Sequence, residues 1–263
     1  MPFIKDQLLL DRVRSASYDD LTTGKLITRW TKIEDATLGT SADGEEIVDN
    51  VGALITTLYR AKRATLSFSN SLLSFSALSI QYGTEREVAD TGSEIIVPQE
   101  DILTVDSAGK IKTKYIPDKE IKYIYELVSG DIARAYVAGS TVSATEFTFD
   151  PTTGEIEVPT GVTGKIYVKY KYSSANAMRV RNRASKFPEA GILTMDVIFR
   201  DSCNENMVYA GKIICPKAKV DPSSIELALT STGKHPITFN MMKDYCAEED
   251  DDELFSFIIV DEN

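Results

Sequence analysis

The sequence predicts a mainly β protein with one short helix. Strand-length runs that alternate apolar and polar side chains fill the C-terminal third, and turn signals recur about every 8–12 residues through the middle. Only one segment has apolar residues at helical spacing. The 263 residues suffice for one large β domain or two smaller ones. We expect residues 96–172 to be an inserted small β-sandwich module, and residues 1–95 and 173–263 to form the main domain.

The first third combines strands with a long polar segment. Lys25–Trp30 is predicted as a strand, and Arg63–Ser69 as another. Between them, Glu34–Asn50 holds six acids and two glycines. This segment is too long for a tight turn, so we expect a loop of the kind that is functional or mobile.

One helix is expected, over residues 70–82. The apolar residues that would share its buried face are Leu72, Leu73, Ala77 and Ile80. Asn70 or Ser71 can accept hydrogen bonds from the unpaired amides at its start. Gly83 stands where a left-handed residue is needed to end the helix. We therefore expect a short helix laid against the sheet.

The middle of the chain has its own rhythm of short strands and turns. Phe147–Val158 has the pattern of a hairpin, because Asp150-Pro151 and Gly154 supply turn geometry. A further turn is expected at Ser129-Gly130-Asp131. The other predicted strands of this module are 94–98, 105–111, 121–128 and 165–172.

The C-terminal third has the strongest strand pattern. Its predicted strands are 192–199, 207–215, 225–229, 237–242 and 254–260. The last two are separated by a run of six acids: Glu248, Glu249, Asp250, Asp251, Asp252 and Glu253. Calcium is a weak alternative for this run, because the spaced carboxylates and glycine of a calcium loop are missing. We interpret it as a solvated hairpin tip whose like charges prevent wrong edge-to-edge pairing.

Composition limits the partners and the compartment. The net charge is −11, so the chain is a poor candidate for holding DNA, although it could lie beside DNA and repel it. No run approaches the roughly 20 apolar residues of a membrane span, and the N-terminus lacks the features of a secretory signal. The three cysteines form no CxxC pair, which favours reduced thiols. We expect a cytoplasmic product with no membrane partner.

No segment has a catalytic or cofactor-binding motif. His235 is the one histidine, and it stands in a predicted turn at the entrance to a strand. Both Gly-Lys pairs, Gly164-Lys165 and Gly233-Lys234, lack the earlier glycine and the following hydroxyl of a phosphate loop. We therefore expect no catalytic residue, no metal and no cofactor, and hence no enzyme.

A small basic cluster follows the middle module. Arg179, Arg181 and Arg183 alternate with other residues, so on a strand their guanidinium groups would share one face. Nucleic-acid binding is one interpretation. Pairing with acids of another subunit is favoured, given the negative chain around the cluster.

The order of these elements is similar to that of a known family. A strand carrying Trp30 is followed by the long acidic loop, and then residues 51–72 lead into a small-residue helix that ends at 80–85. Three later segments continue the pattern before the final strands: residues 186–191, 209–216 and 221–236. Together they resemble the tail tube (major tail) proteins of long-tailed bacteriophages. The resemblance covers residues 1–95 and 173–263, and leaves the middle module as a variable insertion.

The resemblance implies a tail-tube-like β-sandwich or barrel and a structural role in the virion. Such proteins form stacked hexameric rings whose acidic lumen conducts DNA without specific binding during ejection, and they contact other tail proteins. They assemble in the cytoplasm of the host bacterium. The long loop of the family reaches a neighbouring subunit or ring, and the matching residues here are Asp43, Glu45 and Glu46.

Two other functions stay open at the level of sequence. The chain could be another virion protein, such as a baseplate or decoration subunit whose middle module binds a partner. It could also be a carboxylate-based hydrolase, because a pair of catalytic acids leaves no local motif. Tubes that elongate, seen in electron micrographs, would distinguish a tail tube protein from both of these alternatives.

Overall fold

The computed structural model describes residues 7–203, 206–227, 229–230, 233–245 and 252–260. It confirms the prediction of a mainly β protein with one short α-helix in the described part of the chain. The chain separates into two compact units, which we call unit 1 and unit 2. Unit 1 comprises Met1–Arg86 and Val180–Asn263, and unit 2 comprises Glu87–Arg179.

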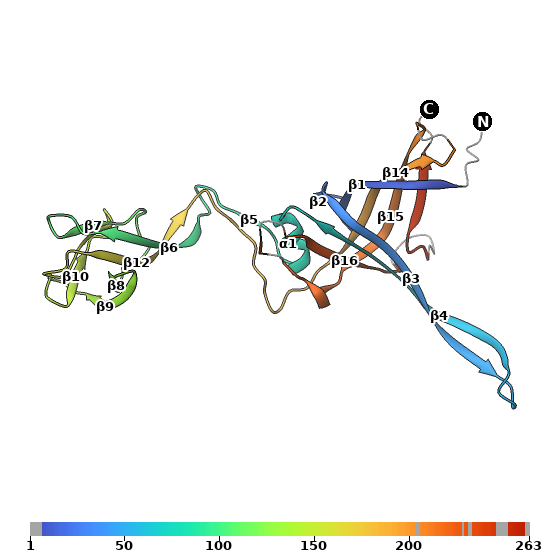
Figure 1. The fold of residues 1–263 in the computed structure, drawn as a ribbon, viewed down its shortest axis with the longest axis horizontal. Coiled ribbons are helices and arrows are strands. Elements are labelled where there is room, and N and C mark those ends of the chain that lie inside the picture. Colours follow the sequence, from blue (N-terminus) through green and yellow to red (C-terminus); the bar gives the residue numbers. More distant parts are fainter. Residues whose placement is uncertain (1–6, 204–205, 228, 231–232, 246–251, 261–263) are drawn as a thin grey trace. The chain divides into compact units, whose positions relative to one another are not determined.

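Unit 1 is built on one eight-stranded sheet (Figure 1). Seven strands follow in the order β2-β1-β14-β15-β16-β4-β3. The eighth, β17, pairs with another part of β15, on the same edge as β16. All pairings in this sheet are antiparallel. The strands are β1 (Leu8–Asp20), β2 (Leu26–Trp30), β3 (Ile33–Val48), β4 (Leu54–Asn70), β14 (Ala190–Asp201), β15 (Val208–Val220), β16 (His235–Met241) and β17 (Ser256–Val260).

The sheet of unit 1 curls over its own core. Trp30 on β2 lies 5.3 Å from Phe68 on β4 by ring centroids, although four strands separate β2 from β4 in the sheet order. In a flat sheet, five strand spacings of about 4.8 Å would keep these rings far apart. Phe239 on β16 contacts both rings and Tyr18 on β1. The two ends of the sheet therefore share one aromatic core.

The helix α1 (Phe75–Tyr82) is shorter than predicted at its start. Asn70 still belongs to β4, so the expected cap at Asn70 or Ser71 is wrong. Ser74 caps the helix instead, because its Oγ accepts from the Ala77 amide at 3.3 Å. Gly83 ends the helix with a left-handed φ of 61°, as predicted.

Two predicted strand features of the C-terminal third are wrong. The described residues within 225–229 form no strand; they follow a 3-10 turn at Pro222–Ser224, which begins at the Asp221 side chain. The final strands also do not form a hairpin with each other. Both β16 and β17 run antiparallel to β15, and they pair with its two ends in succession. Hydrophobic alternation reveals a strand but does not identify its partner.

Unit 2 is a seven-stranded sheet with the order β6-β12-β8-β9-β10-β11-β7, which nearly closes like a barrel. The confirmed hairpin β10–β11 turns at Gly154, which has a φ of 73°. A two-stranded sheet of β5 and β13 joins the ends of the unit. The strands are β5 (Glu87–Val88), β6 (Ile95–Thr104), β7 (Lys110–Lys112), β8 (Tyr123–Val128), β9 (Asp131–Ala138), β10 (Glu146–Phe149), β11 (Glu155–Glu157), β12 (Lys165–Ser174) and β13 (Met178–Arg179).

A buried carboxylate closes the sheet of unit 2. Asp101 on β6 accepts from the Tyr170 hydroxyl at 2.7 Å and from the Lys114 amide, just beyond β7, at 2.9 Å. Gln99 donates to its other oxygen. Burial alone would raise the pKa of Asp101, but the hydrogen bonds from Lys114, Tyr170 and Gln99 outweigh it and lower the pKa. The ionised carboxylate therefore ties the first strand of the sheet to the last.

We expect Asp101→Asn to destabilise unit 2 at pH 7 by about 1–3 kcal/mol, because donors that face a carboxylate would lose an acceptor. A lowered folded-state pKa contributes stability above the unfolded value of about 3.9, and that stability is lost as the pH falls through the folded value. The difference between wild type and variant should thus shrink in acid. Calorimetric melting from pH 7 to pH 3 measures it, and a difference that stays constant with pH would contradict the role of this carboxylate.

Candidate assembly interface

The acidic segment at 34–50 is a strand, and the predicted loop is wrong. It forms β3, which pairs along its whole length with β4 in a long hairpin. At the C-terminal end of β4, residues 64–70 also pair with β16. The preceding residues, 54–63, pair with β3 alone. We call residues 41–63 the arm; Figure 1 shows it extending from the sheet of unit 1.

The turn of the arm has the local sequence features of a hairpin, which the high acid content of the segment obscured. Asp49 Oδ1 accepts from the amides of Val51 and Ala53, and Gly52 has a φ of 85°. Apolar pairs, Ile47-Val48 and Leu54-Ile55, flank this turn. Turn residues between two such pairs are typical of a hairpin, whereas the high acid content indicated a loop.

A β-bulge marks the point where the arm leaves the sheet. Ser41 pairs with Arg63 and Asp43 pairs with Arg60, so β4 holds one extra residue. Within this bulge Ala61 has a φ of 49°, a left-handed conformation that is unfavourable for an L-residue with a side chain. A bulge bends its strand and increases the local twist. The bulge therefore fixes the direction in which the arm extends.

The arm exposes apolar side chains that nothing in the described chain covers. All but one of the residues 54–63 of β4 are exposed. Val51 and Tyr59 are 82% and 74% exposed, and Ile55 is 64% exposed. An isolated two-stranded ribbon is marginally stable in water, and contiguous exposed apolar side chains mark interaction sites. The arm is thus the strongest candidate for an interface.

The predicted contact residues Asp43, Glu45 and Glu46 all lie on this arm. Asp43 forms an ion pair with Arg63 at 3.0 Å, and Glu45 forms one with Arg60 at 3.5 Å. These partners belong to the same hairpin, and all four side chains are about two-thirds exposed. Exposed pairs of this kind contribute about 0–1 kcal/mol. They orient the arm's polar face more than they stabilise it.

The base of the hairpin is held by a lysine from a distant segment. Lys234 Nζ lies 2.8 Å from Glu34 and 2.9 Å from Asp35. The hydrogen bonds from Lys234 and then Ser71 lower the pKa of Glu34, and the two carboxylates raise the pKa of Lys234. Asp35 has a φ of 54° at a second irregularity of β3. The hairpin is therefore fixed at its base while its arm stays exposed.

The basic cluster is not a strand face. Arg179 ends β13 and binds Glu87 of β5 through Nε and Nη2, whereas the residues from 180 to 189 form no strand. Arg181 and Arg183 are exposed, and their carbonyls accept from Thr84 Oγ1 and the Lys186 amide. The alternating arginines indicated a strand, but local turns replace it. A contact of these arginines with another subunit stays a prediction.

The acidic run Glu248–Glu253 lies outside the described residues except for Asp252 and Glu253, of which Asp252 is exposed. The described strands before and after the run, β16 and β17, each pair with β15 and not with each other. No described group of three or more His, Cys, Asp or Glu side chains could hold a metal ion. No described helix is long and apolar enough to cross a bilayer.

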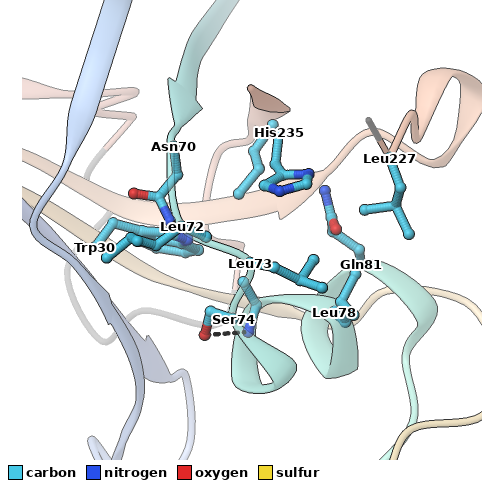
Figure 2. Close-up of a pocket in the computed structure, with 11 residues that line it drawn as sticks. Trp30, Asn70, Leu72, Leu73, Ser74, Leu78, Gln81, Leu227 and His235 are labelled. Atoms are coloured by element: carbon cyan, nitrogen blue, oxygen red, sulfur yellow. Dashed lines mark hydrogen bonds between the residues drawn. The ribbon is translucent and has the colours of Figure 1, made fainter. Parts of the chain in front are cut away.

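A cavity beside α1 is too small for a substrate. His235, Trp30 and Asn70 line it, and its volume is about 10 Å³ (Figure 2). The Trp30 Nε1, Asn70 Oδ1 and His235 Nδ1 atoms are buried without a hydrogen-bond partner in the described structure. A space of this size with three polar atoms suits one bridging water molecule. His235 begins β16, at the entrance to the strand as predicted, and it has no reaction space beside it.

The face of the sheet away from the core carries a row of paired polar groups. Arg29 donates to Ser15, Ser15 donates to Asp196 at 3.0 Å, and Lys212 donates to Asp196 at 2.7 Å. The hydrogen bond from Lys212 is the main cause that lowers the pKa of Asp196. A carboxylate held ionised in this way is unsuited to donate a proton at neutral pH. The row stabilises the sheet across β2, β1, β14 and β15.

Comparison with known proteins decides the family. The profile of the YomU/Tube protein family matches residues 8–259, which is nearly the whole chain. The chain belongs to the YomU/Tube protein family. No curated protein matches it.

The YomU/Tube family is a phage tail tube family, and its members are structural proteins rather than enzymes. Membership confirms the resemblance drawn from the sequence and places the chain in the virion tail. The match includes both units and the arm. A structural role in this family agrees with the exposed apolar side chains of the arm, among them Val51, Ile55 and Tyr59.

Proposed function

We propose that this protein assembles into stacked hexameric rings that form the tube of a phage tail and conduct DNA during ejection. The single observation that carries the proposal is the arm, an exposed apolar ribbon that needs a partner. A second copy of the chain is the partner that a tube family supplies. We further propose that assembly takes place in the host cytoplasm and involves other tail proteins.

Two further properties support a polymer. Strand β2 has a neighbour on one side only, and its residues Leu26 and Ile27 are exposed. Open strand edges favour pairing with another chain unless something covers them, and closure into a shared barrel removes them. The net charge of −11 per chain also suits a conduit that repels phosphate. We propose that residues 96–172 are an insertion outside this tube-forming part.

Negative-stain electron microscopy of the purified protein tests the proposal. We expect rings of six and tubes made of stacked rings, with lengths that increase with protein concentration. A fixed oligomer that never elongates would favour a baseplate or decoration subunit instead. A monomer at every concentration and salt would contradict assembly altogether.

The arm carboxylates give a separate prediction. We expect Asp43→Asn combined with Glu45→Gln to change the free energy of unfolding by no more than about 1 kcal/mol, because each exposed pair is weak. If these residues contact a neighbouring subunit, the variant should assemble less at low salt and equally at high salt, where charges are screened. Light scattering over a salt series measures this, with Glu157→Gln in unit 2 as the control.

A further inference from the structure

Unit 2 carries a groove that assembly does not explain. It has a volume of about 810 Å³ and lies on the outer face of the sheet, over β8 and β12. Tyr123, Tyr125 and Tyr167 line it, together with Lys169, Lys171 and Asp118. A volume within about 300–1,000 Å³, aromatic walls and a few polar groups are typical of a small-ligand site.

The floor of the groove is a fixed aromatic platform. Tyr167 on β12 pairs directly with Tyr125 on β8, and their rings lie 6.0 Å apart by centroids. Glu100 on β6 accepts hydrogen bonds from Lys169, at 3.0 Å, and from Tyr167. These partners hold the Tyr167 ring in place, while Tyr123 is half exposed. Fixed tyrosines offer a large contact area at low cost in conformational entropy.

One end of the groove is formed by the segment before β8. The Asp118 amide donates to the Lys171 carbonyl at 2.7 Å, and the Asp118 carboxylate accepts from Ser173. The segment therefore lies along β12 and brings Lys119, Glu120 and Lys122 to the groove. Ammonium donors and carboxylate acceptors stand side by side next to the tyrosine rings.

The mixture of groups selects a class of ligand. A pyranose ring has apolar C–H faces that pack on aromatic rings, and its rim of hydroxyls both donates and accepts hydrogen bonds. A single-stranded nucleic acid would also stack on tyrosines, and four lysines line the groove, but the carboxylates of Asp118 and Glu120 lie among them and would repel its phosphates. We infer that this groove on unit 2 binds an oligosaccharide. The inference rests on unit 2 alone and does not depend on tube formation.

The test uses the full chain, multimerised by an antibody to a terminal tag so that weak binding becomes measurable. The probe is a printed array of bacterial surface glycans, followed by a saturation-transfer NMR titration with each saccharide that responds. We expect wild type to bind at least one saccharide with a Kd of about 1 mM or tighter. Tyr123→Ala and Tyr167→Ala should each weaken that binding at least about tenfold, with unchanged melting temperatures.

The matched control is Tyr115→Ala, which removes another partly exposed tyrosine of unit 2 that stacks on Tyr172 outside the groove lining. It should bind like wild type. An array without any response, or binding that persists in both groove variants, would overturn the inference. A twelve-residue oligo-dT that binds in the groove more tightly than every saccharide would overturn it in favour of nucleic acid.

Discussion

Ile55→Asp should strongly weaken assembly while leaving the fold of the single chain intact. Ile55 is 64% exposed on the arm and precedes Ala64, the first residue of β4 that pairs with β16. A side chain of this size contributes about 1.5–3 kcal/mol when it becomes fully buried, and a carboxylate in its place must be desolvated without a partner. In a ring or tube this loss recurs at each equivalent contact. The concentration needed for assembly should therefore rise at least about tenfold.

Sedimentation and electron microscopy measure that concentration, and circular dichroism checks the fold. Ile116→Asp is the matched control, because Ile116 is 59% exposed and lies in unit 2. The control should assemble like wild type. Tubes formed by Ile55→Asp at the wild-type concentration would show that the arm is not the interface.

Gly83→Ala should give a larger loss of stability than any other Gly→Ala change at the described glycines of unit 1. A Cβ at this position would lie 1.9 Å from the carbonyl oxygen of Phe187, which is backbone and has little freedom to move. The φ of 61° adds a cost of about 1–2 kcal/mol for an L-residue, and overpacking adds about 1–3 kcal/mol. The Gly83 amide donates to Ile80 and the Thr84 amide to Ser79, so the end of α1 would shift as well.

Gly24→Ala separates the two costs. Gly24 has a φ of 66°, and no atom lies within 4 Å of an added Cβ. It should lose only the backbone cost of about 1–2 kcal/mol. The one tryptophan of the chain, Trp30, is buried in unit 1, so its fluorescence during urea unfolding reports on this unit. Equal losses in the two variants would show that the 83–187 contact relaxes without cost.

Local sequence patterns were sufficient to predict a strand where one of its faces is buried along its length. Residues 192–199 alternate because Leu193, Met195 and Val197 enter the core, and the sequence predicts that strand within β14. The helix end at Gly83 follows from the same kind of local chemistry. Membership of a tube family was likewise predicted from the order of elements, and the family match confirms it.

Elements that depend on pairing were missed or misassigned. The arm is exposed on both faces, so its strands have no apolar period, and pairing of β3 with β4 determines them instead. Strand β1 was not predicted for a similar reason: its first half exposes leucines and charged residues alike, and only Ser15, Ala16 and Tyr18 are buried. The groove on unit 2 combines β8, β12 and the segment at 118–122, which no local window of sequence places together.

The nesting of unit 2 within unit 1 has a consequence for the order of folding. Ser15 and Asp196, joined across β1 and β14, are 181 residues apart in the chain. Closing so long a loop is slow and costs entropy, but a folded unit 2, whose ends already pair through β5 and β13, shortens the effective loop. During synthesis β2 and β3 emerge early, but the other partners of β1 and β4, which are β14 and β16, emerge late, so one edge of β1 and one edge of β4 wait unpaired until then. Early folding of the nested unit shortens the loop that must close once these strands are made, and so limits association between incompletely folded chains.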